Sequence, residues 1–218
     1  MSHADDLSRR LVAIEGPIGV GKTAFASKLA QHLGASTLLD NTQNNPFLSR
    51  FYSDPKSLAL QTQLFFLFER IQQLEGLQQN DLFAGNTICD FLIDKDQLFA
   101  HVVLDEDELK IYQQVFSHLK FKAPTADLVV VLQAPAEVLF ERINQRGLEQ
   151  EQGISLEYLQ QLNDAYTQFF HHYQSSPLLM VNASEIDPVN NDEHFFELLE
   201  YMQNIRSGRH YYNPNPTL

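Results

Sequence analysis

The sequence has few cysteines, few basic residues and no long apolar run, and each shortage excludes a class of protein. Cys89 is the single cysteine, so no disulfide forms within the chain, and a reducing compartment such as the cytoplasm is expected. No apolar run approaches the roughly 18 residues that a membrane-spanning helix needs. The polar residues 1–10 do not have the pattern of a signal peptide.

Basic residues are outnumbered, because 15 Lys and Arg face 28 Asp and Glu, which gives a formal net charge of −13. This charge repels nucleic acid backbones and anionic membranes, so neither is expected as a partner. The chain has 218 residues, of which 44% are hydrophobic, and this is enough for one sizeable core. We expect a single domain at residues 1–206 and a loose tail at residues 207–218.

What the sequence does contain is the glycine-rich motif GPIGVGKT at residues 16–23, a match to G-x-x-x-x-G-K-[ST]. Backbone N–H groups of such a loop, here with Gly16, Gly19 and Gly21, surround nucleotide phosphates. Lys22 is expected to reach the β- and γ-phosphates of ATP, and Thr23 to bind Mg²⁺ through its hydroxyl. An apolar run precedes the motif and helical spacing follows it, as a helix N-terminus that binds an anion requires. The alternative, a glycine loop that only turns the chain, does not explain this context.

Strand and helix patterns alternate along the chain, which is typical of a parallel sheet with helices on both faces. Five strands are expected, at residues 11–15, 36–39, 86–89, 127–132 and 178–181. With the phosphate loop, they predict an α/β P-loop NTPase fold with a five-stranded parallel sheet. A long helix from Pro55 to about residue 79 is apolar on nearly all sides, as expected for the core or, alternatively, a subunit interface.

Three acidic residues, Glu15, Asp40 and Asp90, directly follow expected strands. Ligands of parallel α/β proteins bind at the carboxyl ends of the strands, so all three are expected beside the phosphate loop. A carboxylate at such a place can also cap the next helix, and each residue taken singly leaves both interpretations open. Together, the three indicate Mg²⁺ ligation and a general base.

Two arginines, Arg142 and Arg146, lie four residues apart near the end of an expected helix, and the break with Gly147 follows them. Spacing of four places both side chains on one face, so residues 142–153 are predicted to form a short arginine-bearing lid. Such arginines can neutralise charge on a transferring phosphoryl group. The alternative is a solvated helix face that is favourable to the helix dipole.

Gln63 and Arg70 lie two helical turns apart on the long apolar helix, where polar side chains need partners. A heterocyclic base would supply such partners, and Asp96 is a candidate carboxylate for Arg70. The region between Asp40 and Gln63 contains two basic residues, Arg50 and one lysine. Two positive charges are too few to bind an anionic acceptor. Asp40 instead suits deprotonation of a neutral hydroxyl, so an uncharged alcohol is the favoured acceptor.

These residues resemble the bacterial deoxynucleoside kinase family, especially its deoxyadenosine and deoxyguanosine kinase branch. The resemblance extends from residue 11 to about residue 204 and rests on segments 15–23, 45–48, 51–52, 61–67, 90–100, 146–147 and 152–159. The first segment is shared with many NTPases, whereas the ordered set is specific. The resemblance implies Mg²⁺-dependent transfer of the γ-phosphoryl of ATP to the 5′-hydroxyl of a deoxynucleoside, by a homodimer.

The resemblance also implies roles at individual positions. Asp40 falls where the family has its catalytic base, and Asp90 falls where an acid lies beside the metal and the 5′-end of the substrate. Arg142 and Arg146 match lid arginines. Tyr52 falls where the sugar 3′-hydroxyl is held, as does a second residue, Glu151.

Base recognition in the family is matched by Gln63 together with the pair Arg70 and Asp96. The pair Arg70 and Asp96 favours a purine deoxynucleoside as the substrate, although single changes at such positions can redirect the preference.

The sequence departs from the family at several positions near the reacting groups. Asp40 replaces a glutamate, Asn41 follows it where relatives often carry Pro or Glu, Phe91 stands where many members have an arginine, and Leu148 stands where a further lid arginine is common. Each departure removes reach or positive charge, worth roughly 10²–10³ in rate for electrostatic groups of this kind. A slow enzyme and a nucleotide-binding protein that has lost turnover therefore stay open, as does a nucleoside monophosphate kinase similar to thymidylate kinase.

Overall fold

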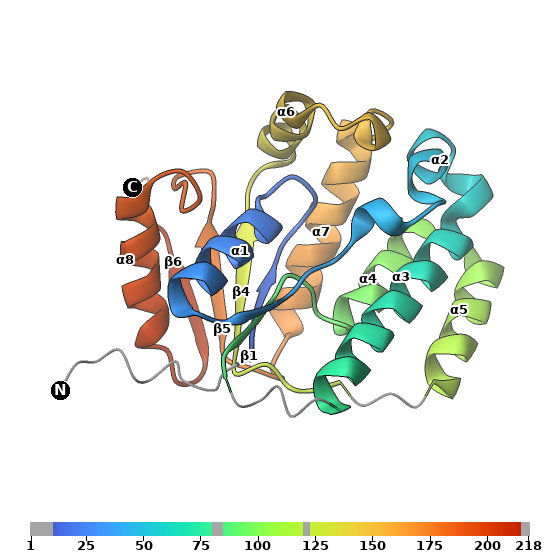
Figure 1. The fold of residues 1–218 in the computed structure, drawn as a ribbon. Helices are drawn as coiled ribbons and strands as arrows, with labels where there is room; N and C mark the ends of the chain where they lie inside the picture. Colours follow the sequence, from blue (N-terminus) through green and yellow to red (C-terminus); the bar gives the residue numbers. More distant parts are fainter. Residues whose placement is uncertain (1–10, 80–84, 120–122, 215–218) are drawn as a thin grey trace.

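The computed structural model describes residues 11–79, 85–119 and 123–214. Its centre is a six-stranded, fully parallel sheet in the order β2-β3-β1-β4-β5-β6 (Figure 1). The strands are β1 (Leu11–Glu15), β2 (Ser36–Leu38), β3 (Thr87–Cys89), β4 (Leu128–Gln133), β5 (Leu178–Asn182) and β6 (Arg209–Tyr212). Since β1 lies between β3 and β4, the loop after β1 begins near the middle of the carboxyl edge of the sheet.

Helices cover both faces of the sheet, as the alternating pattern predicts (Figure 1). They are α1 (Lys22–Leu33), α2 (Leu48–Ser53), α3 (Pro55–Gln79), α4 (Asp94–Val103), α5 (Glu106–His118), α6 (Ala136–Arg146), α7 (Leu156–His172) and α8 (Asp192–Gln203), with the 3₁₀ turns η2 (Thr42–Asn44) and η4 (Glu149–Glu151). None of the described helices is both long and apolar enough to cross a bilayer.

The core is divided by the sheet, because neighbouring residues of a strand point to opposite faces. On β4, Val130 packs in one cluster with side chains from α1, α6 and α8. Its neighbour Val129 packs in a second cluster with side chains from α4 and α7. A third cluster joins α2, α3, α4 and α5 beyond the edge of the sheet. These four helices thus rest on a core of their own.

The long helix α3 belongs mainly to this third cluster, in which Leu67 is fully buried. Its turns are interrupted at Leu58, whose φ of −138° is not helical. Phe68 points outward and is 49% exposed. The predicted position in the core therefore holds for Leu67, whereas Phe65 and Phe66 are only half-buried.

The sixth strand corrects two expectations. β6 pairs in parallel with β5, with Leu178 opposite Arg209 and Val181 opposite Tyr212. The prediction of five strands was therefore wrong, and so was a loose tail from residue 207. A strand of only four residues, close to prolines, has little sequence signal of its own. β6 is stabilised by pairing with β5 and by contact with α8, where the ring centroids of Tyr201 and Tyr212 lie 5.3 Å apart. Residues 1–10 of the predicted domain and residues 215–218 of the predicted tail lie outside the described residues.

Candidate active site

The loop between β1 and α1 adopts a backbone that only glycine accommodates at three positions. Gly16, Gly19 and Gly21 have φ values of 143°, 84° and 101°. A Cβ on Gly16 would lie 2.3 Å from the carbonyl oxygen of Leu132, and one on Gly19 would lie 2.8 Å from Cγ1 of Ile143. The loop is thus fitted between β4 and α6, with the N-terminus of α1 at its end, as a phosphate-binding loop requires.

Lys22 is the first residue of α1, and its ammonium group donates a hydrogen bond to the carbonyl oxygen of Pro17, 3.0 Å away. Burial, with the nearby charge of Lys95, lowers the pKa of Lys22 to about 8. An anionic phosphate in the loop would favour the charged ammonium again, because an opposite charge stabilises the ionised form. Among the described residues, Lys22 has no anionic partner within hydrogen-bond reach, so its ammonium group is suited to a phosphate.

Asp90 joins the phosphate loop to the acceptor side of the site. Its Oδ2 accepts a hydrogen bond from the Thr23 hydroxyl, and its Oδ1 accepts one from the backbone N–H of Asp40, 2.6 Å away. The contact follows from the fold, since the ends of β2 and β3 lie side by side and β3 adjoins β1. Burial raises the pKa of Asp90, whereas the two hydrogen bonds oppose the rise. Thr23 and Asp90 place two oxygen ligands together beside the loop.

Asp40 is held by a buried guanidinium. Arg70 on α3 donates to both of its carboxylate oxygens, and Nε lies 2.9 Å from Oδ1. The same guanidinium donates to Asp96 on α4, so the predicted Arg70–Asp96 pair is present. Burial alone would raise the pKa of Asp40, but Arg70 and then Lys95 outweigh it and lower the pKa to about 2. Asp40 is thus an ionised carboxylate at the pocket wall.

These groups line one cavity of about 320 Å³. It extends from the phosphate loop, with Lys22, to Gln63 on α3 and Tyr52 on α2. Although the whole chain is acidic, the pocket lining has four cations, Lys22, Arg70, Lys95 and Arg146, against three carboxylates, Asp40, Asp90 and Glu151.

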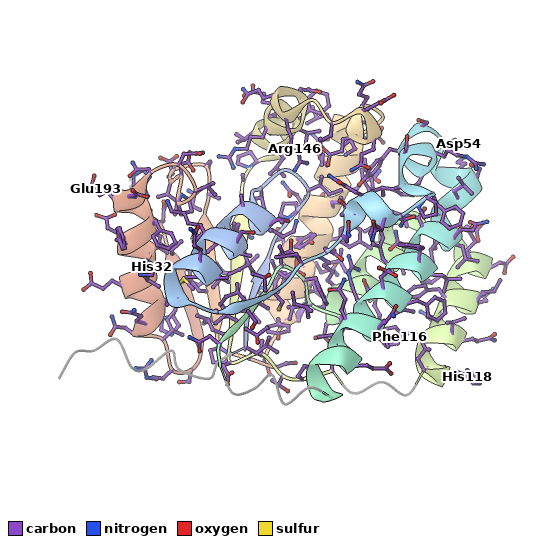
Figure 2. The ribbon with its side chains drawn as sticks, viewed as in Figure 1. His32, Asp54, Phe116, His118, Arg146 and Glu193 are labelled. Atoms are coloured by element: carbon purple, nitrogen blue, oxygen red, sulfur yellow. The ribbon has the colours of Figure 1, made fainter. Side chains whose placement is uncertain are left out.

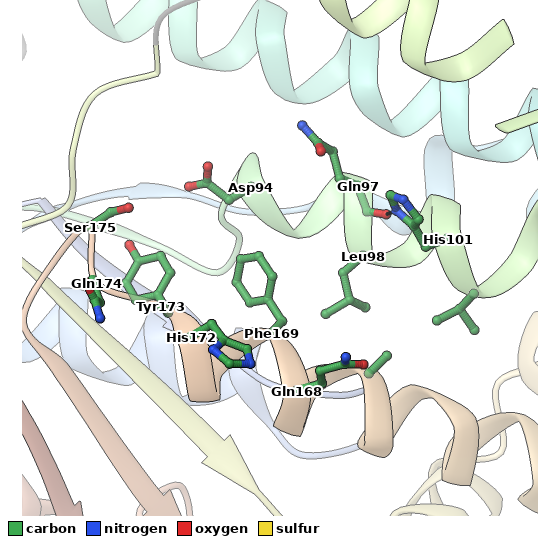
Figure 3. Close-up of a pocket in the computed structure, with 12 residues that line it drawn as sticks. Asp94, Gln97, Leu98, His101, Gln168, Phe169, His172, Tyr173, Gln174 and Ser175 are labelled. Atoms are coloured by element: carbon green, nitrogen blue, oxygen red, sulfur yellow. Dashed lines mark hydrogen bonds between the residues drawn. The ribbon is translucent and has the colours of Figure 1, made fainter. Parts of the chain in front are cut away.

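A larger cavity, of about 860 Å³, lies between α4 and α7 (Figure 3). Figure 3 shows Leu98 and Phe169 pointing toward each other across it. Its described lining includes Asp94 but neither Lys nor Arg. A polyphosphate needs cations or free backbone N–H groups, so the smaller pocket beside the phosphate loop is the candidate active site.

The two predicted lid arginines are separated by the structure. Arg146, the last residue of α6, forms an ion pair with both carboxylate oxygens of Glu151 and lines the pocket; Figure 2 labels it above the phosphate loop. Arg142 instead donates to the carbonyl oxygen of Ala183, 2.8 Å away in the segment after β5, and is not part of this pocket lining. Although both lie on one side of α6, only Arg146 reaches this pocket.

The chain matches a known family over most of its length: the deoxynucleoside kinase family covers residues 12–206. The chain belongs to the deoxynucleoside kinase family. Similar proteins include a deoxyguanosine kinase of Bacillus subtilis (strain 168), 31% identical over 89% of this chain and 96% of that protein. A deoxyadenosine kinase of Dictyostelium discoideum is 34% identical over 81% of this chain and 74% of that protein.

Solved structures agree on the fold of this deoxynucleoside kinase family member. A structure of deoxyadenosine kinase from M. mycoides with products bound has a TM-score of 0.78 and 24% identity, and it covers 89% of this chain and all of that one. A second structure of that enzyme, with bound dATP, has a TM-score of 0.77 at the same coverage. The predicted P-loop NTPase fold of the family is therefore confirmed.

In this family member, two charged residues differ from what sequence reasoning anticipated. Glu15 is fully buried, and its carboxylate accepts hydrogen bonds from the backbone N–H groups of Gly16 and Leu92. Glu15 therefore lies beside the phosphate loop as expected, but a fully buried carboxylate that binds these backbone groups is not placed to ligate Mg²⁺. Lys95, which lines the pocket, was missed, and its only signal was a lysine between two aspartates in segment 90–100.

Gly153, at the end of the lid, offers a test of how the lid rests on α2. A Cβ there would lie 2.5 Å from the carbonyl oxygen of Tyr52 and 3.0 Å from the backbone nitrogen of Ser53. Gly153→Ala is expected to destabilise the fold by roughly 1–3 kcal/mol through overpacking, and to raise KM by displacing Tyr52 in the pocket lining. Chemical denaturation and steady-state kinetics measure the two effects.

The matched control is Gly76→Ala on α3, where an added Cβ meets no atom within 4 Å. Alanine favours a helix over glycine by about 1 kcal/mol, so this variant should be as stable as the wild type or more stable. Equal stability and KM in both variants would show that the lid does not depend on close contact with α2.

Proposed function

We propose that the chain transfers the γ-phosphoryl group of ATP to the 5′-hydroxyl of a deoxynucleoside, with purine deoxynucleosides preferred, in nucleotide salvage. One observation carries the proposal: a single pocket joins the phosphate loop, with Lys22, to Asp40 and the buried Gln63 and Arg70. A donor end and an acceptor end thus meet at Asp40. The names of the relatives, deoxyguanosine kinase and deoxyadenosine kinase, support the same substrate class.

At the acceptor end, we propose that Gln63, Arg70 and Asp96 recognise the base. Gln63 is 4% exposed and lines the pocket, and no described hydrogen bond uses its side-chain amide. One oxygen of Asp96, Oδ2, is buried without a hydrogen-bond partner among the described residues. A purine edge would supply the donors and acceptors that these groups need.

We propose that the sugar lies between Tyr52 and Glu151, beneath Arg146. Both residues line the pocket, and Glu151 is fixed by its ion pair with Arg146. Burial raises the pKa of Tyr52 well above its ordinary value, so its phenol stays a neutral hydrogen-bond donor. A donor and a carboxylate acceptor suit a sugar hydroxyl. Arg142, directed at Ala183, would act only if the lid rearranges on ATP binding.

Mg²⁺ fits the oxygen ligands that Thr23 and Asp90 bring together. Mg²⁺ is commonly bound by one or two carboxylates together with substrate phosphates and water, so it does not need a large protein cluster. The described residues contain no group of three or more His, Cys, Asp or Glu side chains placed to hold a metal by themselves. When bound with ATP, the ion would neutralise charge on the phosphates, and Thr23 with Asp90 would orient it.

A nucleoside monophosphate kinase is a weaker candidate, because its acceptor is an anion. The two cations between Asp40 and Gln63, Arg50 and Lys56, are both exposed and do not line the pocket. Asp40 would instead repel an acceptor phosphate. The uncharged 5′-hydroxyl of a nucleoside is the acceptor that this charge pattern favours.

The decisive test is incubation with ATP and Mg²⁺ and each of the four deoxynucleosides. We expect the monophosphates of deoxyadenosine or deoxyguanosine to form fastest, because Gln63, Arg70 and Asp96 suit a purine. If no monophosphate forms from any of the four deoxynucleosides, the proposal is overturned. Phosphorylation of dTMP without phosphorylation of nucleosides would support the monophosphate kinase, and ATP-dependent thermal stabilisation without turnover would support a nucleotide sensor.

We further propose that residues 1–206 form a single kinase domain with a lid at residues 142–153, and that the protein acts as a cytoplasmic homodimer. The dimer follows the resemblance to the family, and sedimentation equilibrium of the purified chain measures it directly. A mass equal to one chain at assay concentration would contradict the dimer.

A further inference from the structure

Lys95 is a buried cation whose role the proposed reaction has not yet required. It is the second residue of α4, its side chain is 3% exposed, and it lines the active-site pocket. A buried ammonium group is costly unless carboxylates pair with it. The position of its partners therefore indicates what the fold gains from keeping a lysine at this place.

The first partner is Glu15, whose Oε1 lies 3.2 Å from Nζ of Lys95. Glu15 is itself immobilised, because Leu92 and Gly16 donate backbone N–H groups to it and Tyr166 donates its hydroxyl. Lys95 is thus anchored to a carboxylate fixed at the root of the phosphate loop.

The second partner is Asp40, whose Oδ2 lies 3.7 Å from Nζ of Lys95. Asp40 therefore faces two cations, Arg70 and Lys95. Arg70 also binds Asp96 and lies in the part of the pocket assigned to the base, so a bound base competes for its donors. Lys95 is tied to Glu15 instead and stays available to Asp40 whatever occupies the base site.

We infer that Lys95 is a positioning residue that holds the Asp40 carboxylate at the acceptor hydroxyl during turnover. The inference rests on the proposed function, since it gives Asp40 a task in phosphoryl transfer. It also accounts for Phe91, which is buried with Cζ of Arg70 5.7 Å from its ring and brings no charge to the acceptor side. The positive charge on the acceptor side is instead supplied by Lys95 on α4, four residues after Phe91 in the sequence.

A double-mutant cycle with Lys95→Met and Asp40→Asn tests the inference. If Lys95 acts through Asp40, Lys95→Met should lower kcat roughly tenfold to a hundredfold in the wild-type background, with KM for the nucleoside nearly unchanged. In the Asp40→Asn background the same change should lower kcat less than about threefold, because contacting residues are not additive. A lysine that only neutralises Glu15 would lower kcat equally in both backgrounds, and that outcome would overturn the inference.

Two further variants complete the test, one as a replacement in case of misfolding and one as a control. Lys95→Gln keeps an N–H donor for Glu15 while removing the charge beside Asp40, and it replaces Lys95→Met in the cycle if the latter does not fold. Lys28→Met is the matched control, because Lys28 pairs with Asp192 on α8, outside the pocket, and should leave kcat unchanged.

The same proteins separate this inference from the proposed function. A wild-type protein that phosphorylates no deoxynucleoside overturns the proposed function, and the contact is then tested by denaturation midpoints. Non-additive midpoints for the Lys95 and Asp40 changes would support the contact. Additive midpoints would overturn it.

Discussion

Lys22→Ala is expected to lower turnover about a thousandfold or more, the largest loss from any single change in the active site. The transferring phosphoryl group spreads negative charge over its oxygens, and catalysis depends almost entirely on positioning and charge stabilisation. Lys22 begins the helix that follows the phosphate loop, and its ammonium group rests on the carbonyl oxygen of Pro17. The phosphates of ATP would give the Lys22 ammonium an anionic partner in place of the neutral carbonyl oxygen of Pro17. Initial rates with saturating ATP and deoxynucleoside measure the loss.

The control for this prediction is Lys28→Ala, a change six residues later on the same helix. Lys28 binds the carbonyl oxygen of Val189 and the carboxylate of Asp192, away from the pocket. Both variants remove a lysine from α1, but only Lys22→Ala should affect kcat, while the denaturation midpoint confirms that each is folded. A Lys22→Ala enzyme with nearly the wild-type rate would show that the loop does not bind the phosphates of the donor.

The phosphate loop could be predicted from the sequence because its chemistry is local. Gly16, Gly19 and Gly21 are required by their backbone dihedrals, and Gly16 and Gly19 also by close neighbouring atoms, and a short motif records such constraints directly. The parallel sheet was equally accessible, since apolar runs alternate with helical spacing. β6 was not, because four edge residues depend on pairing with β5 rather than on their own pattern.

The acceptor side was only partly predictable, because its charges meet through the tertiary structure. The pair of Arg70 and Asp96 was foreseen, but the bidentate contact of Arg70 with Asp40 joins residues 30 apart in the chain. Lys95 on α4 reaches Glu15 at the end of β1, and no spacing rule connects them. Helical spacing also gave Arg142 and Arg146 the same side of α6, whereas their partners in the fold differ. Spacing identifies a face of a helix but not what lies opposite each residue.

Asp40→Asn is expected to lower kcat by roughly 10²–10³ while KM for the deoxynucleoside changes little. With a pKa lowered to about 2, Asp40 is a weak base, so in the proposed reaction it would mainly orient the 5′-hydroxyl and accept its proton late. A carboxylate has about four lone-pair sites, so Asp40 can accept the hydroxyl while still binding Arg70. Asparagine loses the charge and turns one oxygen into a donor, which would face the guanidinium of Arg70 or the ammonium of Lys95.

Two further variants decide whether such a loss belongs to catalysis. Asp96→Asn weakens the other carboxylate on Arg70, away from the acceptor hydroxyl, and should raise KM for the nucleoside more than it lowers kcat. Asp40→Glu keeps the charge with one more methylene and should retain far more activity than Asp40→Asn. If Asp40→Asn turned over at the wild-type rate, Asp40 would be only a partner of Arg70. If the wild type had no turnover and Asp40→Asn bound ATP equally well, the pocket would be that of a nucleotide sensor.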